Sequence, residues 1–468
     1  METKQNSMKK NILILCILLC TNAFSQSINE LELSFEEYIS YVKQFHPIVK
    51  QANLKLEEGE YNLLKARGSF DPKIEAIYNR KDFKNKEYYN LFNATFKVPT
   101  WYGVELKANF ENNDGLFLNP QNNVPDDGLF SAGISASLGQ GLIINERMAT
   151  LKKAKYFIEQ NKAERTLAVN QVLYEASIAY FEWLQTYNEQ KMYSRFLENA
   201  KTRYNGVRKS VLAGDKPGID SLEANININN RKLSLEQSNI KFLKNTLKVS
   251  NFLWLDSGVP LEINTSVTPV QLQETTVDKV LSLNQNINFE INNHPKLNAL
   301  NNKIKSLNVD AKLKANMLLP KVDVQYNFIT ENPDISNSYS SNNYKLGLNV
   351  SFPLFLRKER GSLKLTKLKI DASKFERLNT SITITNKVEA LKKELDSYTT
   401  QIELIDSVVK DYKTLLNAEE RKFSFGESSV FLINYRESSL IDAELKALKL
   451  KNMFYKTKVK LFEALGNI

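Results

Sequence analysis

The order of structural elements in this chain is decided by a stretch that occurs twice. Residues 46–79 read HPIVKQANLKLEEGEYNLLKARGSFDPKIEAIYN, and residues 294–327 read HPKLNALNNKIKSLNVDAKLKANMLLPKVDVQYN. The His-Pro, Pro-Lys and Tyr-Asn pairs all recur at one shift (294 − 46 = 248), so 34 residues repeat without a gap. Because this duplication is too long for a solenoid repeat, it indicates two similar halves.

Each half is expected to contain a helix, strands, a long helix, a turn and a further helix. The prolines after the two histidines fit the first turn of a helix, where the missing N–H has no cost. Strict alternation of apolar and polar residues then predicts strands, because successive side chains in a strand take opposite faces. The expected strands are 73–79, 92–98, 104–110 and 130–138 in the first half, and 322–328 and 344–352 in the second.

The first half is longer than the second by two strands. The Leu-Ala-Gly-Asp turn at 212–215 corresponds to Ser-Phe-Gly-Glu at 424–427, a shift of only 212 (424 − 212). The first half therefore holds 36 extra residues (248 − 212), which an additional hairpin at about 90–112 accounts for. The pattern leaves open whether this hairpin joins the same sheet as the other strands.

Two segments without proline, 145–213 and 361–425, predict helices of about 100 Å at about 1.5 Å per residue. The second carries apolar residues in unbroken 4,3 spacing, which is typical of a coiled coil. They are Ile384, Val388, Leu391, Leu395, Tyr398, Ile402, Ile405, Val409, Tyr412 and Leu416. Turns at Gly214 and Gly426 are expected to fold each long helix back on its successor, giving two antiparallel hairpins.

The N-terminus reads as a secretory signal peptide, with lysines followed by the apolar run 12–19 and a cleavage site before Gln26. The alternative is lipidation at Cys20, although Leu19 stands where a small residue is usual. Cleavage removes both cysteines, so no disulfide is expected. The resulting domains are 1–25 (signal peptide), 26–255 (first repeat), 256–277 (linker) and 278–468 (second repeat).

Composition excludes several classes of protein. Only 16 glycines and 12 prolines in 468 residues favour a few long elements. The 63 basic and 53 acidic residues are interspersed along helices, which indicates solvated faces and no nucleic-acid footprint. The 2 histidines, His46 and His294, are most simply helix-entry residues. Since no phosphate loop, nucleophile motif or metal-ligand set is present, we expect no enzyme, no cofactor and no metal.

The strands approach the roughly 9 to 11 residues that cross an outer membrane. One chain has too few strands for a barrel, since about eight is the minimum, and open edges in lipid leave backbone groups without partners. Several chains must then share one barrel. The sequence predicts an α+β membrane protein, a trimeric transmembrane β-barrel of four to six strands per chain continued by a long α-helical coiled-coil tunnel.

The chain resembles the TolC-like outer-membrane efflux proteins. The resemblance rests on the duplication, the His-Pro helix starts, the strand end Ser-Phe-Pro-Leu-Phe at 351–355, the Gly-Glu turn at Gly426 and the terminal Leu465-Gly466. It implies a homotrimer in the bacterial outer membrane, surrounded by lipid and extending into the periplasm. There it would dock on a periplasmic adaptor and an inner-membrane pump. Such a duct, in tripartite efflux or type I secretion, passes drugs, metals or proteins passively.

The resemblance also implies a periplasmic gate, at which this sequence departs from the family. The acidic ring positions, six and nine residues after the turn glycine, are Leu432 and Tyr435. We therefore expect an apolar constriction that closes by dewetting. Asp220 matches the family, but its usual arginine partner is replaced by Ser428. Arg421, Lys422 and Arg436 are the alternative sources of that positive charge.

The two turns are the expected contacts for the adaptor, through Gly214, Asp215, Gly426 and Glu427. Each glycine also has the simpler role of ending a helix in the left-handed conformation. The apolar residues near the turns are expected either to be exposed for a partner or to pack in the core. They are Leu212, Phe423, Phe425, Val430 and Phe431. An exported coiled-coil structural or adhesive envelope protein is the alternative function, and it leaves the alternating strands without a role.

Overall fold

The computed structural model describes residues 31–468 apart from 265, 284–289, 333, 335–339 and 467–468. The expected signal peptide and the alternative lipidation site lie outside the described residues. The chain forms two compact units. Unit 1 comprises Met1–Ser40, Ala179–Thr276 and Ile405–Asn452, and unit 2 comprises Tyr41–Ile178, Val277–Leu404 and Met453–Ile468.

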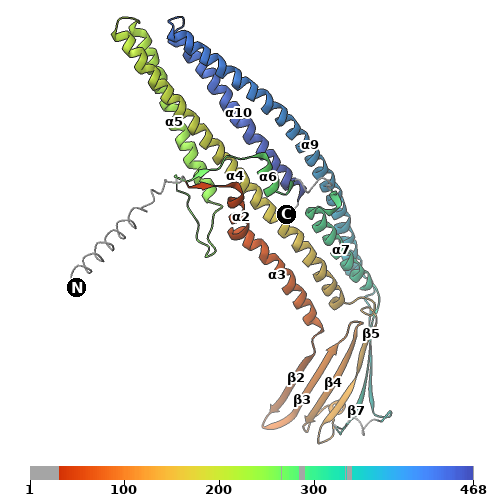
Figure 1. The fold of residues 1–468 in the computed structure, drawn as a ribbon. Coiled ribbons are helices and arrows are strands. Elements are labelled where there is room, and N and C mark those ends of the chain that lie inside the picture. The colour runs from red at the N-terminus through yellow and green to blue at the C-terminus, as the bar shows by residue number, and fades with distance from the viewer. Residues whose placement is uncertain (1–30, 265, 284–289, 333, 335–339, 467–468) are drawn as a thin grey trace, which may run out of the picture. The chain divides into compact units, whose positions relative to one another are not determined.

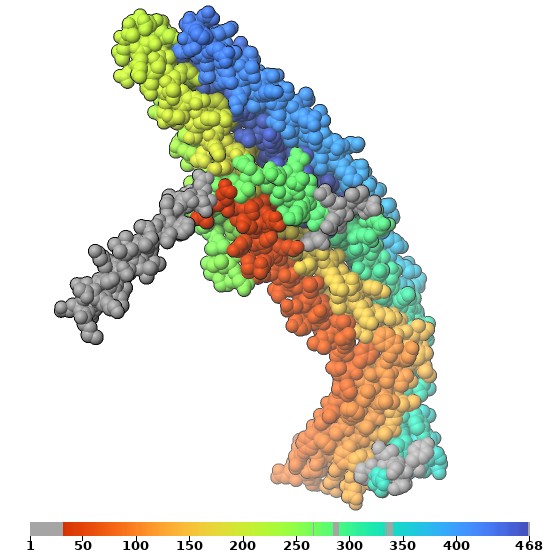
Figure 2. Space-filling model, in the orientation of Figure 1, coloured from red at the N-terminus to blue at the C-terminus, as the bar shows by residue number. Residues whose placement is uncertain are grey.

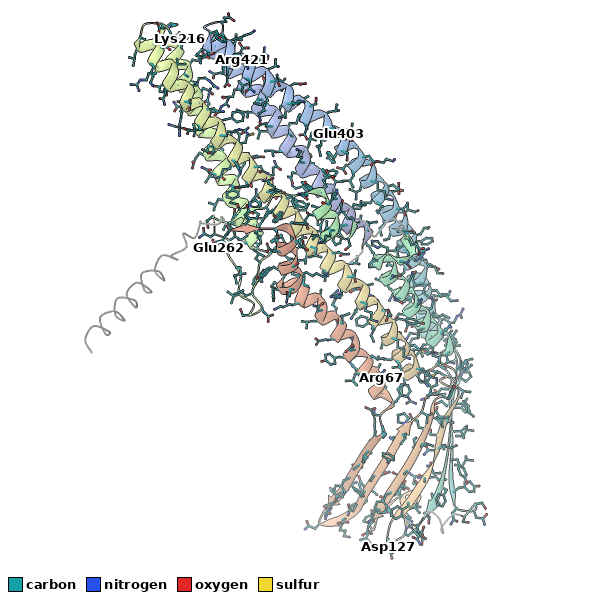
Figure 3. All side chains as sticks on the ribbon, viewed as in Figure 1. Arg67, Asp127, Lys216, Glu262, Glu403 and Arg421 are labelled. Carbon is teal, nitrogen blue, oxygen red and sulfur yellow. The ribbon has the colours of Figure 1, made fainter. Side chains whose placement is uncertain are left out.

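Unit 2 contains one antiparallel sheet of six strands in the order β2-β3-β4-β5-β7-β8. The strands are β2 Lys73–Phe83, β3 Lys86–Pro99, β4 Val104–Asp114, β5 Leu129–Gly139, β7 Lys321–Thr330 and β8 Tyr344–Ser351. The extra hairpin of the first half forms β3 and β4 and lies inside the sheet, between β2 and β5 (Figure 1). Arg67 and Asp127 lie near opposite ends of these strands (Figure 3).

The register of the strands sorts apolar and polar side chains onto opposite faces. One row of directly paired residues runs across all six strands and is apolar throughout. It consists of Ile74, Phe96, Ala108, Ala132, Phe328 and Tyr344. Large apolar side chains on this face, such as Leu346 and Leu348, are exposed. The face is therefore uncovered in the single chain, which usually marks a surface for another protein or a membrane.

Two helices of unit 2 begin at the repeated His-Pro pairs. They are α3, Pro47–Arg67, and α7, Pro295–Asn316. The Nδ1 atom of each preceding histidine accepts a hydrogen bond from a backbone N–H two residues later, at 3.3 Å for His46 and 3.1 Å for His294. Both imidazoles are buried, and burial is the main cause that lowers the pKa of each. The helix-entry role expected from the sequence is confirmed.

We expect these histidines to make unit 2 less stable in mild acid. Because each folded-state pKa is lowered, the unfolded chain binds more protons as the pH falls below about 6.5, and protonation then favours unfolding. Replacing both by asparagine, His46→Asn with His294→Asn, keeps a capping oxygen but removes the titration. Thermal unfolding at about pH 7.5 and about pH 5.5 should differ less in this variant than in wild type. An equal difference would assign the acid sensitivity to other groups.

Four long helices form the two expected hairpins (Figure 1). These are α4 Glu146–Leu212 with α5 Gly218–Ser250, and α9 Arg357–Ser424 with α10 Val430–Leu465. Gly214 and Gly426 have φ of 85° and 80°, so both turns use the left-handed conformation that glycine permits. Helix α9 begins four residues before the expected position (361 − 357 = 4), directly after Leu356, which has a positive φ of 49°. In the described part of the chain, no helix has both the length and the apolar content required to cross a bilayer.

The apolar residues of α9 that are spaced alternately by four and three positions pack into the protein core, as a coiled coil requires. In unit 2, Ile384, Val388 and Leu391 form a core with the end of α10 at Ala464 and Leu465. In unit 1, a second core joins all the long helices except α5, and its members are Met192, Phe196, Leu416, Ile433, Leu440 and Ile441. Each fully buried aliphatic side chain stabilises the hairpin by about 1.5–3 kcal/mol relative to an exposed one.

Short elements complete unit 1 and the junctions of the long helices. Strand β1 (Glu32–Leu33) pairs in parallel with β6 (Thr268–Pro269), and the other α-helices in the described residues are α2 (Phe35–Phe45) and α6 (Glu274–Val280). The hydroxyl of Tyr180 on α4 donates to the carbonyl of Leu33 at 2.8 Å, and the indole N–H of Trp183 donates to Thr246 on α5 at 2.9 Å. These buried aromatic residues fasten β1 and α5 to α4.

Candidate functional site

The ends of both hairpins lie together in unit 1 (Figures 2 and 3). Val207 on α4, Ala224 on α5 and Val430 on α10 form a buried apolar cluster, with Phe423 packed against it. Lys216 lies in the turn between α4 and α5, and its ammonium group is 3.5 Å from the centre of the Phe423 ring. Contacts between the repeats therefore hold the two turns next to each other.

The turns expose apolar side chains to solvent. Leu212, Phe425 and Phe431 are exposed, whereas Val430 is buried and Phe423 is half-buried. The sequence left exposure and core packing open for these five residues, and the structure divides them between the two. The candidate contact residues are all exposed, namely Gly214, Asp215, Gly426 and Glu427. An exposed apolar surface at the end of a hairpin is suited to a protein partner.

The two residues expected at the gate lie one turn apart on α10. Leu432 and Tyr435 are both exposed, and Ile433 between them is buried in the core of unit 1. The helix thus presents Leu432 and Tyr435 away from the chain's own core. Both side chains are therefore accessible to solvent in the single chain.

The two other candidate gate residues are not joined in this chain. The Ser428 hydroxyl donates to Oε1 of Glu419 at 2.6 Å, and Nε of Arg436 lies 3.8 Å from Oε2 of the same carboxylate. Asp220 is half-buried in the first turn of α5, where the helix dipole favours a carboxylate. Arg436 is one of the three residues that could supply the positive charge missing at Ser428. Its guanidinium group lies beside Glu419.

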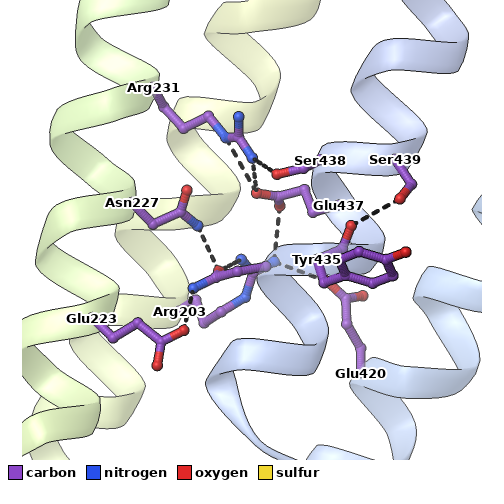
Figure 4. A network of polar contacts seen from close by, with 10 residues as sticks. Arg203, Glu223, Asn227, Arg231, Glu420, Tyr435, Glu437, Ser438 and Ser439 are labelled. Atoms are coloured by element: carbon purple, nitrogen blue, oxygen red, sulfur yellow. Dashed lines mark hydrogen bonds and ion pairs between the residues drawn. The ribbon is translucent and has the colours of Figure 1, made fainter.

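A buried ionic network, which the sequence did not reveal, joins the two hairpins (Figure 4). The side chain of Glu437 on α10 is 0% exposed, and those of Arg203 on α4 and Arg231 on α5 are 9% and 10% exposed. Arg203 Nη2 lies 2.9 Å from Glu437 Oε1, and Arg231 Nη2 lies 3.3 Å from Oε2. One carboxylate is therefore shared by two buried guanidinium groups from the other hairpin.

Further polar contacts extend this network to all four long helices. Arg203 also reaches Glu420 on α9 at 3.3 Å. Asn434 accepts from Asn227 at 2.6 Å and donates to Glu223 at 3.3 Å. A chain of charge-assisted hydrogen bonds thus fixes the position of α10 relative to α4 and α5. Tyr435 lies on α10 between Asn434 and Glu437 (Figure 4).

One signal in the sequence could have indicated this network. Apolar residues of α10 follow each other at spacings of three and four, at Leu440, Ala443, Ala447, Leu450 and Phe454. Extending this pattern backwards from Leu440 reaches Glu437 and then Ile433. An acid at a core position of a coiled coil requires a buried partner of opposite charge. The sequence could not identify that partner, because Arg203 and Arg231 are more than 200 residues away (437 − 231 = 206).

Residues 287–467 match the model of a protein family described as outer membrane efflux protein. The first half of the chain, which this match does not cover, has the same order of helix, strands and hairpin. No curated protein is similar enough to count as a match.

Solved structures of outer-membrane channels have the same fold as this chain over both halves. The CmeC channel of Campylobacter jejuni is 13% identical, with a TM-score of 0.64 over 92% of this chain and 85% of that one. The VceC protein of Vibrio cholerae is 12% identical, with a TM-score of 0.64 over 92% and 95%. The open MtrE channel of Neisseria gonorrhoeae is 13% identical, with a TM-score of 0.64 over 94% and 93%.

The family match and this fold confirm the resemblance to TolC-like outer-membrane efflux proteins. Together they support an outer-membrane channel of efflux systems, located in the outer membrane and reaching into the periplasm. The family and these structures are of channel proteins and not of enzymes. Among the described residues of the chain, no group of three or more His, Cys, Asp or Glu side chains could hold a metal ion.

Proposed function

We propose that this chain is one subunit of a homotrimeric duct, with a shared β-barrel in the outer membrane and a periplasmic tunnel of helical hairpins. The observation that carries the proposal is the six-stranded sheet with one apolar face and two edge strands, β2 and β8, that pair with no further strand of the described residues. A barrel needs about eight strands, and unpaired edges are not tolerated in lipid. Pairing β2 of one copy with β8 of the next satisfies both edges.

The extra hairpin makes this barrel wide. Three copies of the six-stranded sheet give 18 strands (3 × 6). Barrels of about 16–18 strands enclose an aqueous channel, whereas about eight strands leave room only for side chains. The apolar face would then contact lipid and the polar face would line the lumen.

The hairpins carry a second surface for copies of the same chain. Helix α5 exposes an apolar stripe with heptad-related spacing. Its members are Ile219, Leu222, Ile226, Leu233, Ile240 and Leu247. This stripe has no partner among the described residues of the chain, and a helix from a neighbouring subunit would complete it. An exported structural protein would have no use for the two-faced sheet, which is why we favour the duct.

Cysteine cross-linking tests the pairing of β2 with β8. The mature chain would contain no cysteine, because Cys16 and Cys20 precede the expected cleavage site. Ala76→Cys on β2, combined in turn with Leu346→Cys, Leu348→Cys and Val350→Cys on β8, samples several registers on one face. At least one pair should form covalent trimers on oxidation, because paired strands bring Cα atoms to about 5.5 Å.

The matched control for this experiment uses an inner strand. Ala132→Cys on β5 lies between β4 and β7 and is out of reach of a neighbouring subunit. Combined with Ala76→Cys, it should give no trimer. If no pair on β8 cross-links in protein extracted from the outer membrane, the shared barrel is rejected.

The remaining assignments concern partners and gating. The exposed turns at Gly214, Asp215, Gly426 and Glu427 would contact a periplasmic adaptor, which connects the duct to an inner-membrane pump. Leu432 and Tyr435 would form the apolar gate, with Asp220 and Ser428 beside it. The cargo would be drugs, metals or proteins, moved outward without chemistry by the duct itself.

A further inference from the structure

One row of residues across the polar face of the sheet is unusually rich in lysine. The row follows direct pairing from β2 to β8, and four of its six positions are lysines. It consists of Lys73, Lys97, Lys107, Gly133, Asn327 and Lys345. Lys73 pairs directly with Lys97, and Lys97 with Lys107. Like charges in direct opposition destabilise a sheet, so this arrangement is costly without a function or a counter-charge.

Four carboxylates on this face are each bound to a cation. Two bind lysines of the row, since Glu75 lies 2.5 Å from Lys97 and Glu111 lies 3.6 Å from Lys345. The other two bind cations outside the row. These contacts are Glu105 with Arg147 at 2.8 Å and Asp323 with Lys321 at 3.2 Å.

Two lysines of the row form no such close ion pair, although Lys73 and Lys107 are both near enough to Glu75 to interact with it electrostatically. Within the described residues, no carboxylate oxygen lies within 4.0 Å of the ammonium group of Lys73 or Lys107. Lys107 lies at the wall of an open depression of about 590 Å³ on the polar face, which Ser135, Gln325 and Asn349 also line. The depression itself is lined by three cations, Lys107, Arg147 and Lys321, and by three carboxylates, Glu105, Glu146 and Asp323. The surplus positive charge therefore belongs to the row, where four lysines face two bound carboxylates.

We propose that this lysine row makes the duct prefer anions, and that it favours solutes carrying carboxylate or phosphate groups. The inference rests on the proposed function, because the polar face lines a water-filled lumen only when the sheets close a barrel. Three copies of the chain then place three rows in one lumen. Lysine side chains lining a pore attract anions and repel cations, and low-dielectric walls strengthen that field.

The reversal potential of the full-length trimer in a planar bilayer, under a gradient of potassium chloride, tests the proposal. Wild type should favour chloride over potassium. Lys73→Gln with Lys107→Gln removes the two unpaired charges without breaking an ion pair, and should lower the chloride-to-potassium permeability ratio by about two-fold or more. Lys73→Glu with Lys107→Glu should lower it further.

Two controls make the result specific to the row. Lys410→Gln with Lys413→Gln makes the same change of charge on exposed positions of α9 and should leave the ratio unchanged. Repeating each measurement with Leu432→Ser and Tyr435→Ser relieves the proposed gate, so that the constriction cannot hide the effect of the sheet. The anion preference is overturned, and the duct kept, if the channel favours potassium. The same conclusion follows if the lysine variants leave the chloride-to-potassium permeability ratio unchanged, both with the native gate residues and with Leu432→Ser and Tyr435→Ser. A folded trimer without conductance in either background overturns the duct, and the anion preference with it.

Discussion

Replacing Glu437 by glutamine is expected to loosen α10 from α4 and α5 by about 3–5 kcal/mol, the usual cost of removing one member of a buried ion pair. The glutamine keeps the size of the side chain but leaves Arg203 and Arg231 buried without their main counter-charge. Amide hydrogen exchange in α5 and α10 of unit 1 measures this local stability. About 3 kcal/mol corresponds to exchange roughly a hundred-fold faster.

A second ion pair on α10 provides the matched control. Glu444 binds Arg195 of α4, whose side chain is 51% exposed. Because solvent screens such a pair, Glu444→Gln should cost less than about 1 kcal/mol. Similar exchange rates in the Glu437→Gln and Glu444→Gln variants would show that the buried network does not hold α10.

A triple apolar replacement separates charge from packing. Glu437→Leu with Arg203→Met and Arg231→Leu removes all three buried charges while roughly keeping their volume. Replacing a complete buried ion network by apolar residues is often neutral or stabilising. Slow exchange in the triple variant, beside fast exchange in Glu437→Gln, would assign the effect to unpaired arginines and not to lost contacts.

Much of the fold could be predicted from the sequence because its signals are local. Alternation over 322–328 and 344–352 appears as β7 and β8, and the two helices without proline appear as α4 and α9. The 36 extra residues of the first half predicted an additional hairpin, and this hairpin forms β3 and β4. Its place inside the sheet was left open, because alternation specifies the faces of a strand but not its neighbours.

What the sequence missed depends on contacts between distant segments. Strand β2 continues to Phe83, beyond the expected end at residue 79, because Arg80 and Lys81 pair with β3 despite their polar side chains. The network around Glu437 requires α4, α5, α9 and α10 to be placed in space, which no spacing within one helix provides. The lysine row likewise appears only when the register of all six strands is known.

Replacing Leu432 and Tyr435 together by serine is expected to raise the single-channel conductance by at least about two-fold, because a polar constriction stays hydrated where an apolar one dewets. The two side chains lie on the exposed side of α10, with Ile433 anchored in the core behind them. The substitution therefore changes the surface of the hairpin and leaves its packing intact. Purified trimers in a planar bilayer give the measurement.

The matched control places serine at exposed apolar residues outside the proposed gate, as Leu212→Ser with Phe431→Ser. These changes should leave the conductance unchanged and weaken binding of an adaptor, because both residues lie beside the turns. A large wild-type conductance that the gate variant does not alter would retain the duct and reject the gate at these positions. The Glu437→Gln variant adds a further distinction, since it loosens α10 while keeping both gate side chains. Raised conductance in that variant would mean that the buried network holds the gate closed, whereas unchanged conductance would mean that the apolar side chains close it without help from the network.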